Sequence, residues 1–183
     1  MIAMDKRSDM IAGAMLAFEA EGFRGIGVDA VLAASGASTR TLYKHFGSRD
    51  GLVLAVLEHR HRIFMDCIAG SVADPVGALF ETLEQWLTER GARGCMLLRA
   101  RSEYAGANAE VVALVRRQKE EFGAEIARRV AAALGRADAA LATQIWLLFE
   151  GATAAASVSG MSAVDAARAA AATLLAAARG SAA

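Results

Sequence analysis

Apolar side chains recur every three or four residues along almost the whole chain, and this spacing is what most constrains the fold. Such a period places them on one face of an α-helix, whereas a strand needs strict alternation, which no segment sustains. Alanine dominates the composition and aromatic residues make up only 6%, in agreement with helices. The sequence therefore predicts an all-α fold of about nine helices.

Glycine, proline and capping residues set the predicted helix limits. Gly22 follows the first apolar row, at a position where glycine commonly ends a helix. Ser38 and Ser48 precede the third and fourth rows and are expected to cap them. Asp74 followed by Pro75 predicts the start of a fifth helix. The expected helices are 6–21, 29–35, 39–45, 49–72, one starting at 74–75, then 95–104, 108–134, 139–158 and 163–179.

Charge and cysteine content exclude several classes of protein. The 183 residues carry 20 basic and 20 acidic side chains, so the whole chain is not a general polyanion binder. Cys67 and Cys95 are too few for a disulfide scaffold or a four-cysteine zinc site. The charged N-terminus lacks the apolar core of a signal peptide, and Glu150 and Arg168 interrupt the longest apolar runs. We expect a cytoplasmic protein without a membrane span.

Motifs for catalysis or cofactor binding are missing from the sequence. His59 and His61 are two residues apart and point in different directions on a helix, so they cannot form an i, i+4 metal pair. The sequence has no glycine-rich phosphate loop, no H-E-x-x-H and no nucleophile elbow. We expect no metal, no cofactor and no enzymatic activity. Cys67 and Cys95 are expected to be buried as small apolar residues, with a thiol-based switch as the alternative.

The stretch 36–49 is locally basic, because it holds Arg40, Lys44, Arg49 and His45 and no acidic residue. It contains the third predicted helix, which a glycine-containing turn joins to the second in the manner of a helix-turn-helix. Hydroxyls and cations on such a helix suit the phosphates and base edges of a major groove. A solvated basic helix in a helical bundle has the same composition, so both interpretations stay open at this point.

The same stretch resembles the tetracycline-repressor (TetR) family of bacterial transcriptional regulators. The matching elements are Gly22-Phe23, the turn Ser35-Gly36-Ala37-Ser38, the run Thr41-Leu42-Tyr43-Lys44-His45-Phe46, then Ser48-Arg49-Asp50 and Leu52. The resemblance is specific over residues 7–60 and looser beyond, where Gly94-Cys95, Glu103-Tyr104 and residues 144–152 match one branch of the family. It implies a helix-turn-helix DNA-binding domain, residues 1–50, and a helical effector-binding and dimerisation domain, residues 51–183.

The resemblance implies DNA contacts by the third helix and its flanks. These predicted contacts are Ser38, Thr39, Arg40, Thr41, Tyr43, Lys44, His45 and Arg49. Tyr43 and His45 are expected on the sugar-phosphate backbone and Arg49 beside a phosphate. Leu42 and Phe46 are expected to hold the helix in the core.

Two departures from the family pattern affect the expected DNA contacts. Residues 25–28 precede the second helix without a hydroxyl group, where the family usually has threonine or serine, so one backbone contact is in doubt. Arg40 stands at a position that is often glycine. We expect Arg40 to help select the operator.

The last two predicted helices are almost entirely apolar, which indicates burial on more than one side. We expect them to pack against a second copy of the chain. The predicted dimer interface consists of Leu141, Ile145, Leu148, Ala152, Ala155, Val164, Ala167, Ala171, Leu174 and Leu175. An alanine-rich helix that closes only the chain's own core is the alternative.

Large apolar side chains of the second domain are candidates for an effector pocket. The predicted ligand contacts are Phe64, Phe80, Trp86, Met96, Phe122, Trp146, Phe149 and Glu150. Core packing is the alternative role of each apolar residue. Glu150 either selects a cationic ligand, pairs with an arginine at the dimer seam, or faces water. Arg99 and Glu103 are expected to form an ordinary i, i+4 pair.

The function that the resemblance implies is a ligand-responsive repressor. A homodimer would bind a near-palindromic double-stranded DNA operator and be released by a small, largely apolar molecule of unknown identity. Two alternatives remain: a helical small-molecule-binding protein without specific DNA binding, and a cysteine-based redox switch on the same fold.

Overall fold

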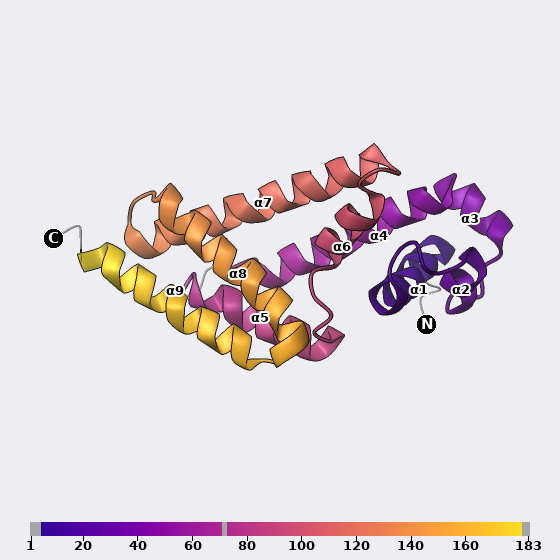
Figure 1. Cartoon of the computed structure of the whole chain (residues 1–183). Coiled ribbons are helices and arrows are strands. Elements are labelled where there is room, and N and C mark those ends of the chain that lie inside the picture. The colour runs from indigo at the N-terminus through magenta and orange to yellow at the C-terminus, as the bar shows by residue number, and fades with distance from the viewer. Residues whose placement is uncertain (1–4, 71–72, 181–183) are drawn as a thin grey trace. The chain divides into compact units, whose positions relative to one another are not determined.

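Nine α-helices and no strand are present in the part of the chain that the computed structural model describes, residues 5–70 and 73–180 (Figure 1). The helices are α1 (Lys6–Glu21), α2 (Val28–Ala33), α3 (Thr39–Phe46), α4 (Arg49–Ile68), α5 (Gly77–Arg90), α6 (Met96–Tyr104), α7 (Ala109–Leu134), α8 (Ala139–Ser159) and α9 (Ser162–Gly180). The all-α prediction is confirmed. The fourth helix ends at Ile68, earlier than expected, and its predicted last residue, Val72, lies outside the described residues.

Serine side chains cap α3 and α4, the two helices for which the sequence predicts a serine cap. Ser38 Oγ accepts a hydrogen bond from the amide of Thr41 at 3.2 Å, at the start of α3. Ser48 Oγ accepts one from the amide of Gly51 at 2.9 Å, in the first turn of α4. Both predicted caps are confirmed. By contrast, α2 follows Gly27 and has no side-chain cap, as its hydroxyl-free approach predicts.

Contacts divide the chain into two compact units. The first consists of Met1–Phe64 and Met96–Gln118, so that α6 and the start of α7 belong with α1 to α3 and most of α4. The second consists of Met65–Cys95 and Lys119–Ala183, which include α5, the rest of α7, α8 and α9.

The core of the first unit is built around α1 and the loop that follows it. Phe18 and Phe23 are fully buried and their rings stack with centroids 5.0 Å apart. Leu42 of α3 is fully buried, as expected. Phe46 is only half-buried, and the guanidinium of Arg7 lies over its ring at 5.2 Å.

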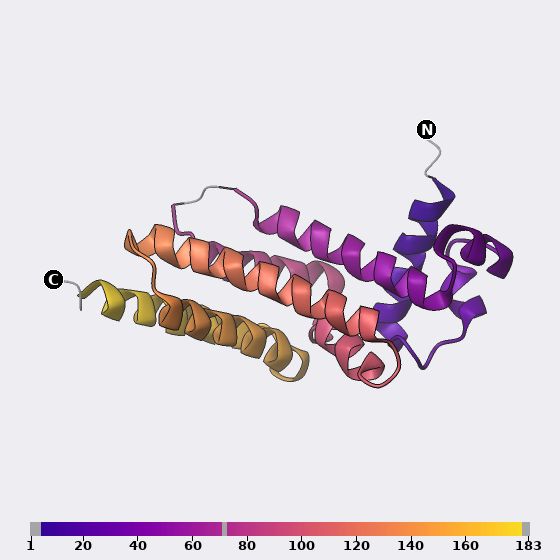
Figure 2. The same cartoon turned by 90° about the horizontal axis from the view of Figure 1, so that it is seen from above.

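The core of the second unit is built around an antiparallel pair, α8 and α9, which lie side by side in both views (Figures 1 and 2). Helix α9 also packs against α5. By length and composition α8 passes as a membrane span, contrary to the expectation from the sequence. Because Ile145, Phe149 and Ala152 of α8 are buried inside the folded chain, we treat it as a core helix.

Candidate nucleic-acid interface and ligand site

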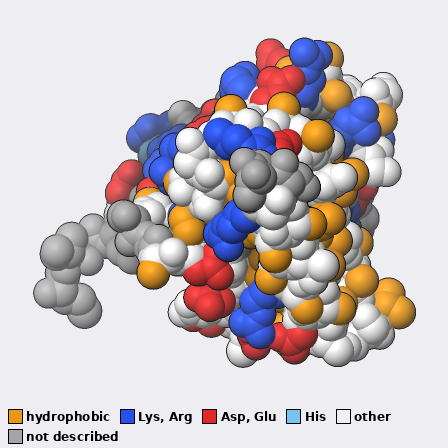
Figure 3. All heavy atoms as spheres, turned by 90° about the vertical axis from the view of Figure 1, so that its left-hand side faces the viewer, with side chains coloured by type: hydrophobic (Ala, Val, Ile, Leu, Met, Phe, Trp, Pro, Cys, Tyr) orange, Lys and Arg blue, Asp and Glu red, His pale blue; other side chains and the backbone are white. Residues whose placement is uncertain are grey.

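Polar and cationic side chains are exposed along α3. Ser38, Thr39, Arg40, Tyr43 and Lys44 are exposed, and Thr41 and His45 are half-buried. Tyr43 keeps 54% of its surface exposed. The buried Leu42 anchors the helix, so the predicted DNA contacts from Ser38 to His45 lie together on one short helix and its cap. Figure 3 shows another face of the molecule, the one on the left-hand side of Figure 1. On this face Lys and Arg side chains, Asp and Glu side chains and hydrophobic side chains are interspersed.

Arg49, the remaining predicted DNA contact, is half-buried and bonded within the protein. Its Nη2 donates hydrogen bonds to the carbonyls of Phe23 and Ile26, the latter at 2.9 Å. Its Nη1 donates to the hydroxyl of Tyr104 at 3.2 Å. The guanidinium also lies 5.5 Å from the ring centroid of Phe18. Arg49 therefore joins the loop after α1 to the end of α6, a connection that local sequence patterns do not contain.

The end of α6 holds the same loop through a carboxylate. Glu103 Oε2 accepts hydrogen bonds from the amides of Phe23 and Arg24, at 2.9 and 2.7 Å. Glu103 Oε1 accepts one from Nε of Arg99 at 3.1 Å, so the predicted i, i+4 pair is confirmed. The pair also has a role that its i, i+4 spacing does not predict. Arg99 holds the Glu103 carboxylate, which accepts hydrogen bonds from two backbone amides.

Asp50, at the start of α4, is the third point of attachment. Its carboxylate accepts hydrogen bonds from the hydroxyl of Tyr104 at 3.2 Å and from Nδ2 of Asn108 at 2.8 Å. Tyr104 is buried and its ring meets Phe23 edge to face, with centroids 6.3 Å apart. Burial raises the pKa of the Tyr104 phenol, and the negative charge of Asp50 raises it further.

Three aromatic rings meet in the second unit. The Phe149 ring centroid lies 5.9 Å from that of Phe80 on α5 and 4.8 Å from that of Phe122 on α7. Trp86 is also buried, with the guanidinium of Arg90 over its ring at 4.2 Å. Of the predicted ligand residues, this unit contains Phe80, Trp86, Phe122, Trp146, Phe149 and Glu150, whereas Phe64 and Met96 belong to the first unit.

Glu150 is paired with Lys119, a partner that none of its three expected roles includes. Its Oε1 lies 2.5 Å from Nζ of Lys119 on α7, and the two side chains are only 14% and 16% exposed. Glu150 is therefore neither paired with an arginine of this chain nor turned to water. Its other oxygen, Oε2, and Nε1 of Trp146 are buried without a hydrogen-bond partner among the described residues.

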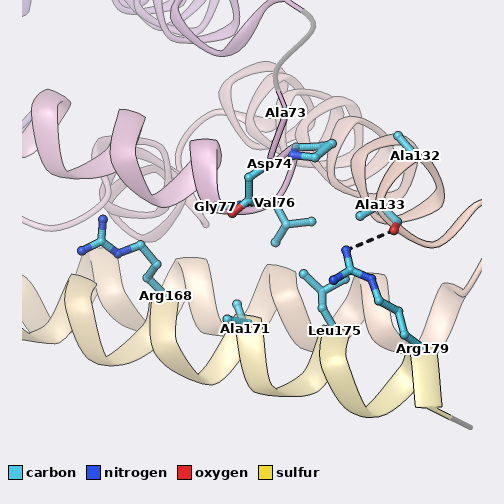
Figure 4. Close-up of a pocket in the computed structure, with 12 residues that line it drawn as sticks. Ala73, Asp74, Val76, Gly77, Ala132, Ala133, Arg168, Ala171, Leu175 and Arg179 are labelled. Carbon is cyan, nitrogen blue, oxygen red and sulfur yellow. Dashed lines mark hydrogen bonds between the residues drawn. The ribbon is translucent and has the colours of Figure 1, made fainter.

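A separate cleft of about 570 Å³ lies in the second unit between the start of α5, the end of α7, and α9 (Figure 4). Val76, just before α5, and Leu175 of α9 line it from opposite sides, and Arg168 and Arg179 lie at its two ends. Arg179 donates to the carbonyl of Ala133 at 3.2 Å, and Arg168 is paired with Asp165 at 2.8 Å. None of the predicted ligand residues lines this cleft, and its cations already have partners.

The two cysteines differ from expectation. Cys67 is exposed and Cys95 is half-buried, so the predicted burial is wrong for Cys67, which lies on the outward side of the last turn of α4. Over residues 5–70 and 73–180, no three His, Cys, Asp or Glu side chains are grouped so as to hold a metal ion.

Comparison with protein families identifies the N-terminal part of the chain. Residues 10–56 match the family model of bacterial regulatory proteins, tetR family. This segment runs from α1 through α3 into α4 and contains every predicted DNA contact. Among curated proteins no sequence matches the chain.

Solved structures extend the similarity over both units. A TetR-family transcriptional regulator from Streptomyces coelicolor is 24% identical with a TM-score of 0.84, over 93% of this chain and 94% of that one. A putative TetR transcriptional regulator from Streptomyces avermitilis is 25% identical with a TM-score of 0.72, over 90% and 98%. A TetR transcriptional regulator from Chloroflexus aurantiacus is 24% identical with a TM-score of 0.76, over 92% of each chain.

Proposed function

We propose, from the premise that this chain is a DNA-binding transcriptional regulator of the TetR family, that it represses transcription as a homodimer on a near-palindromic operator. A small, largely apolar effector would bind residues 51–183 and release residues 1–50 from the DNA. The observation that carries the proposal is the exposed face of α3, which lies inside the matched segment and within a stretch free of acidic residues. A repressor of this kind acts in the cytoplasm and has no enzymatic role.

DNA contact by α3 follows from the side chains that it exposes. Arg40 and Lys44 supply cations to phosphates or guanine edges, and Tyr43 supplies a hydroxyl and an exposed ring. Because Leu42 holds the helix from behind, these groups project from a rigid element rather than from a loop. Arg49 contributes through the loop after α1, whose carbonyls at Phe23 and Ile26 accept its hydrogen bonds.

Dimerisation is proposed through the exposed side of α8 rather than through the whole set expected from the sequence. Of that set, Leu141, Ile145, Ala152, Val164, Ala167, Ala171 and Leu175 are buried within the chain, Leu148 and Leu174 are half-buried, and Ala155 is exposed. The buried members hold α8 and α9 in their own core. Leu147 and Val158 are 57% and 91% exposed, and with Gly151 and Ala154 they form one stripe along α8. This exposed α8 stripe is the surface for a second copy.

Release by an effector needs an equilibrium between two arrangements of the dimer. An effector that binds the arrangement unable to reach both half-sites shifts the population away from DNA. Glu103 and Tyr104 belong to the proposed effector domain but are bonded to Phe23 and Asp50 of the proposed DNA-binding domain. We propose these bonds as the connection through which α6 influences the DNA-binding segment.

Selection of bound DNA from a random pool, at two salt concentrations, tests the proposal. The expected result is a palindromic consensus whose binding weakens steeply with salt, because phosphate contacts release counterions. Lys44→Ala and Tyr43→Ala should abolish the consensus. Arg117→Ala, which removes an exposed cation from α7 instead, should preserve it. Recovery of no consensus, with weak binding that fades with salt, would contradict the proposal and favour a small-molecule-binding protein without specific DNA binding.

A further inference from the structure

The cleft between the start of α5, the end of α7 and α9 has the size and the charge pattern of a ligand site (Figure 4). Its volume of about 570 Å³ lies in the range of pockets that bind small molecules. Arg168, Ala171, Leu175 and Arg179 line it at intervals of three or four residues, so they share one face of α9. This face presents an apolar stretch with a cation at each end.

The middle of the cleft is apolar on both sides. Val76 and Leu175 are 1% and 5% exposed and line it from opposite sides. The carboxylate in the lining is that of Asp74, which lies between the two arginines in Figure 4 and accepts a hydrogen bond from the amide of Gly77 at 2.9 Å. Its negative charge disfavours an anion beside it, so the anionic groups of a ligand belong at the two ends.

The arginines at the two ends can each take an anion while the chain stays folded. Arg168 is paired with Asp165 on the same helix at 2.8 Å, and the two side chains are 42% and 58% exposed. Such exposed pairs contribute little to stability, so a ligand carboxylate can replace Asp165. Arg179 uses Nη2 for the carbonyl of Ala133. Because a guanidinium carries five N–H donors, others remain for a carboxylate.

A buried arginine holds one wall of the cleft in place. Arg129 of α7 has a side chain that is only 3% exposed, and its Nε donates to Glu125 at 2.7 Å. Its Nη1 donates to the carbonyl of Pro75 at 2.7 Å, and its Nη2 donates to the carbonyl of Ile68. Pro75 begins the segment 75–77 that lines the cleft. These bonds fix the segment beside α7, in keeping with the largely pre-formed sites that bind small molecules.

We infer that this cleft binds an elongated molecule with an apolar middle and a carboxylate at each end. Arg168 and Arg179 are 11 positions apart on α9, which corresponds to about 16 Å along a helix. Long arginine side chains can reach inwards, so a linear dicarboxylate of medium length bridges them. Its apolar chain lies between Val76 and Leu175. This site is separate from the predicted aromatic ligand residues and does not depend on DNA binding.

Calorimetry on the full chain without DNA tests the assignment with three probes of the same carbon chain. Decanedioate has two carboxylates, decanoate has one, and decane-1,10-diol has none. We expect decanedioate to bind at least about tenfold more tightly than decanoate, and decanoate more tightly than the diol, since each carboxylate adds charge-assisted hydrogen bonds. Equal binding of decanedioate and decanoate, or binding of none of the three, overturns the assignment.

Variants of the two arginines locate the preference in the cleft. Arg168→Gln and Arg179→Gln should each weaken decanedioate binding by about tenfold and leave the diol unaffected. Arg117→Gln, which removes an exposed cation from α7 outside the cleft, is the matched control and should bind decanedioate like the wild type. An equal loss in Arg117→Gln, or no loss in either cleft variant, overturns the assignment.

A steric variant tests the cleft independently of charge. Ala172 lines the cleft but is exposed, so Ala172→Trp should fill the space without disturbing the core and should abolish decanedioate binding. Ala166→Trp, at an exposed position of α9 outside the lining, should keep it. Undiminished binding in Ala172→Trp overturns the assignment. Loss of the DNA consensus with intact decanedioate binding would contradict only the proposed function, and the reverse result only this inference.

Discussion

The carboxylate of Glu103 is bonded to the backbone amide of Phe23, 80 residues earlier in the chain, at 2.9 Å. The same oxygen accepts a second bond from the amide of Arg24, so one acid on α6 satisfies two consecutive amides of the loop after α1. Hydrogen bonds to a carboxylate are stronger than those between neutral groups. Two of them on consecutive amides are therefore expected to hold this loop in one conformation.

Replacing Glu103 by alanine should destabilise the first unit. Two loop amides lose their acceptor and Arg99 loses its partner, so we expect the free energy of unfolding to fall by about 1–3 kcal/mol. Urea unfolding followed by circular dichroism measures the change. Glu110→Ala, on the exposed start of α7, is the matched control and should stay within about 0.5 kcal/mol of the wild type. Equal stability of the two variants would show that the carboxylate contributes nothing to the loop.

Gly22 should not tolerate a side chain. Its φ is +85°, and an added Cβ would lie 2.5 Å from Nη2 of Arg99 and 2.8 Å from Oε1 of Glu103. We expect Gly22→Ala to cost more than about 1 kcal/mol in thermal or urea unfolding, from strain together with disturbance of the pair. Gly27→Ala is the comparison, because Gly27 has an ordinary φ and nothing within 4 Å of the added carbon. A Gly22→Ala protein as stable as Gly27→Ala would refute the argument from close approach.

Stability at alkaline pH should depend on Tyr104. Its pKa is raised in the folded protein, first by burial and then by the charge of Asp50, above the value of about 10 for an unfolded tyrosine. The folded state therefore holds the phenol proton more tightly. This contribution is complete below about pH 10 and is lost as the pH rises through the folded-state pKa. Between pH 9 and 11, the wild type should lose more unfolding free energy than Tyr104→Phe.

Tyr43→Phe is the control for that pH series, because Tyr43 is 54% exposed and Tyr104 is left in place. It should keep the wild-type slope of stability against pH. Identical slopes for the wild type and Tyr104→Phe would exclude a contribution from the buried phenol.

A charge in the exposed α8 stripe should separate the proposed dimer. Leu147→Glu places a carboxylate opposite its own copy across a twofold interface, so the protein should sediment as a monomer at concentrations where the wild type is a dimer. Ala127→Glu introduces the same charge on the exposed side of α7 and should leave the dimer intact. A Leu147→Glu protein that remains dimeric would move the interface to another surface.

Helix positions were predictable because their signals are local. Ser38 and Ser48 cap helices a few residues away, and Gly22 ends α1 through its own backbone conformation. The buried side of α8 and α9 was harder to predict, since a helix that is apolar almost all round gives little information about its orientation. For that reason the expected dimer residues include many that pack within the chain.

The candidate site was predictable only where its residues are neighbours in sequence. The exposed row on α3 was expected, whereas the partners of Arg49 and Glu150 were not, because Tyr104 and Lys119 lie on other helices. An arginine after a helix-turn-helix looks the same in the sequence whether it binds a phosphate or two backbone carbonyls. Only its surroundings in the fold distinguish the two roles.

Helix α6 belongs to the first unit although it follows α5 of the second unit in the sequence. This limits where the chain can be cut into fragments or joined to a related protein. A fragment cut after α4 would lack Tyr104, whose ring meets Phe23, and would leave the loop amides without Glu103. A chimera that transplants residues 1–60 onto a relative therefore inherits that relative's α6 in place of its own. In a chimera of this protein, we therefore expect the end of α6 to be needed together with residues 1–60 for the loop after α1 to keep its contacts.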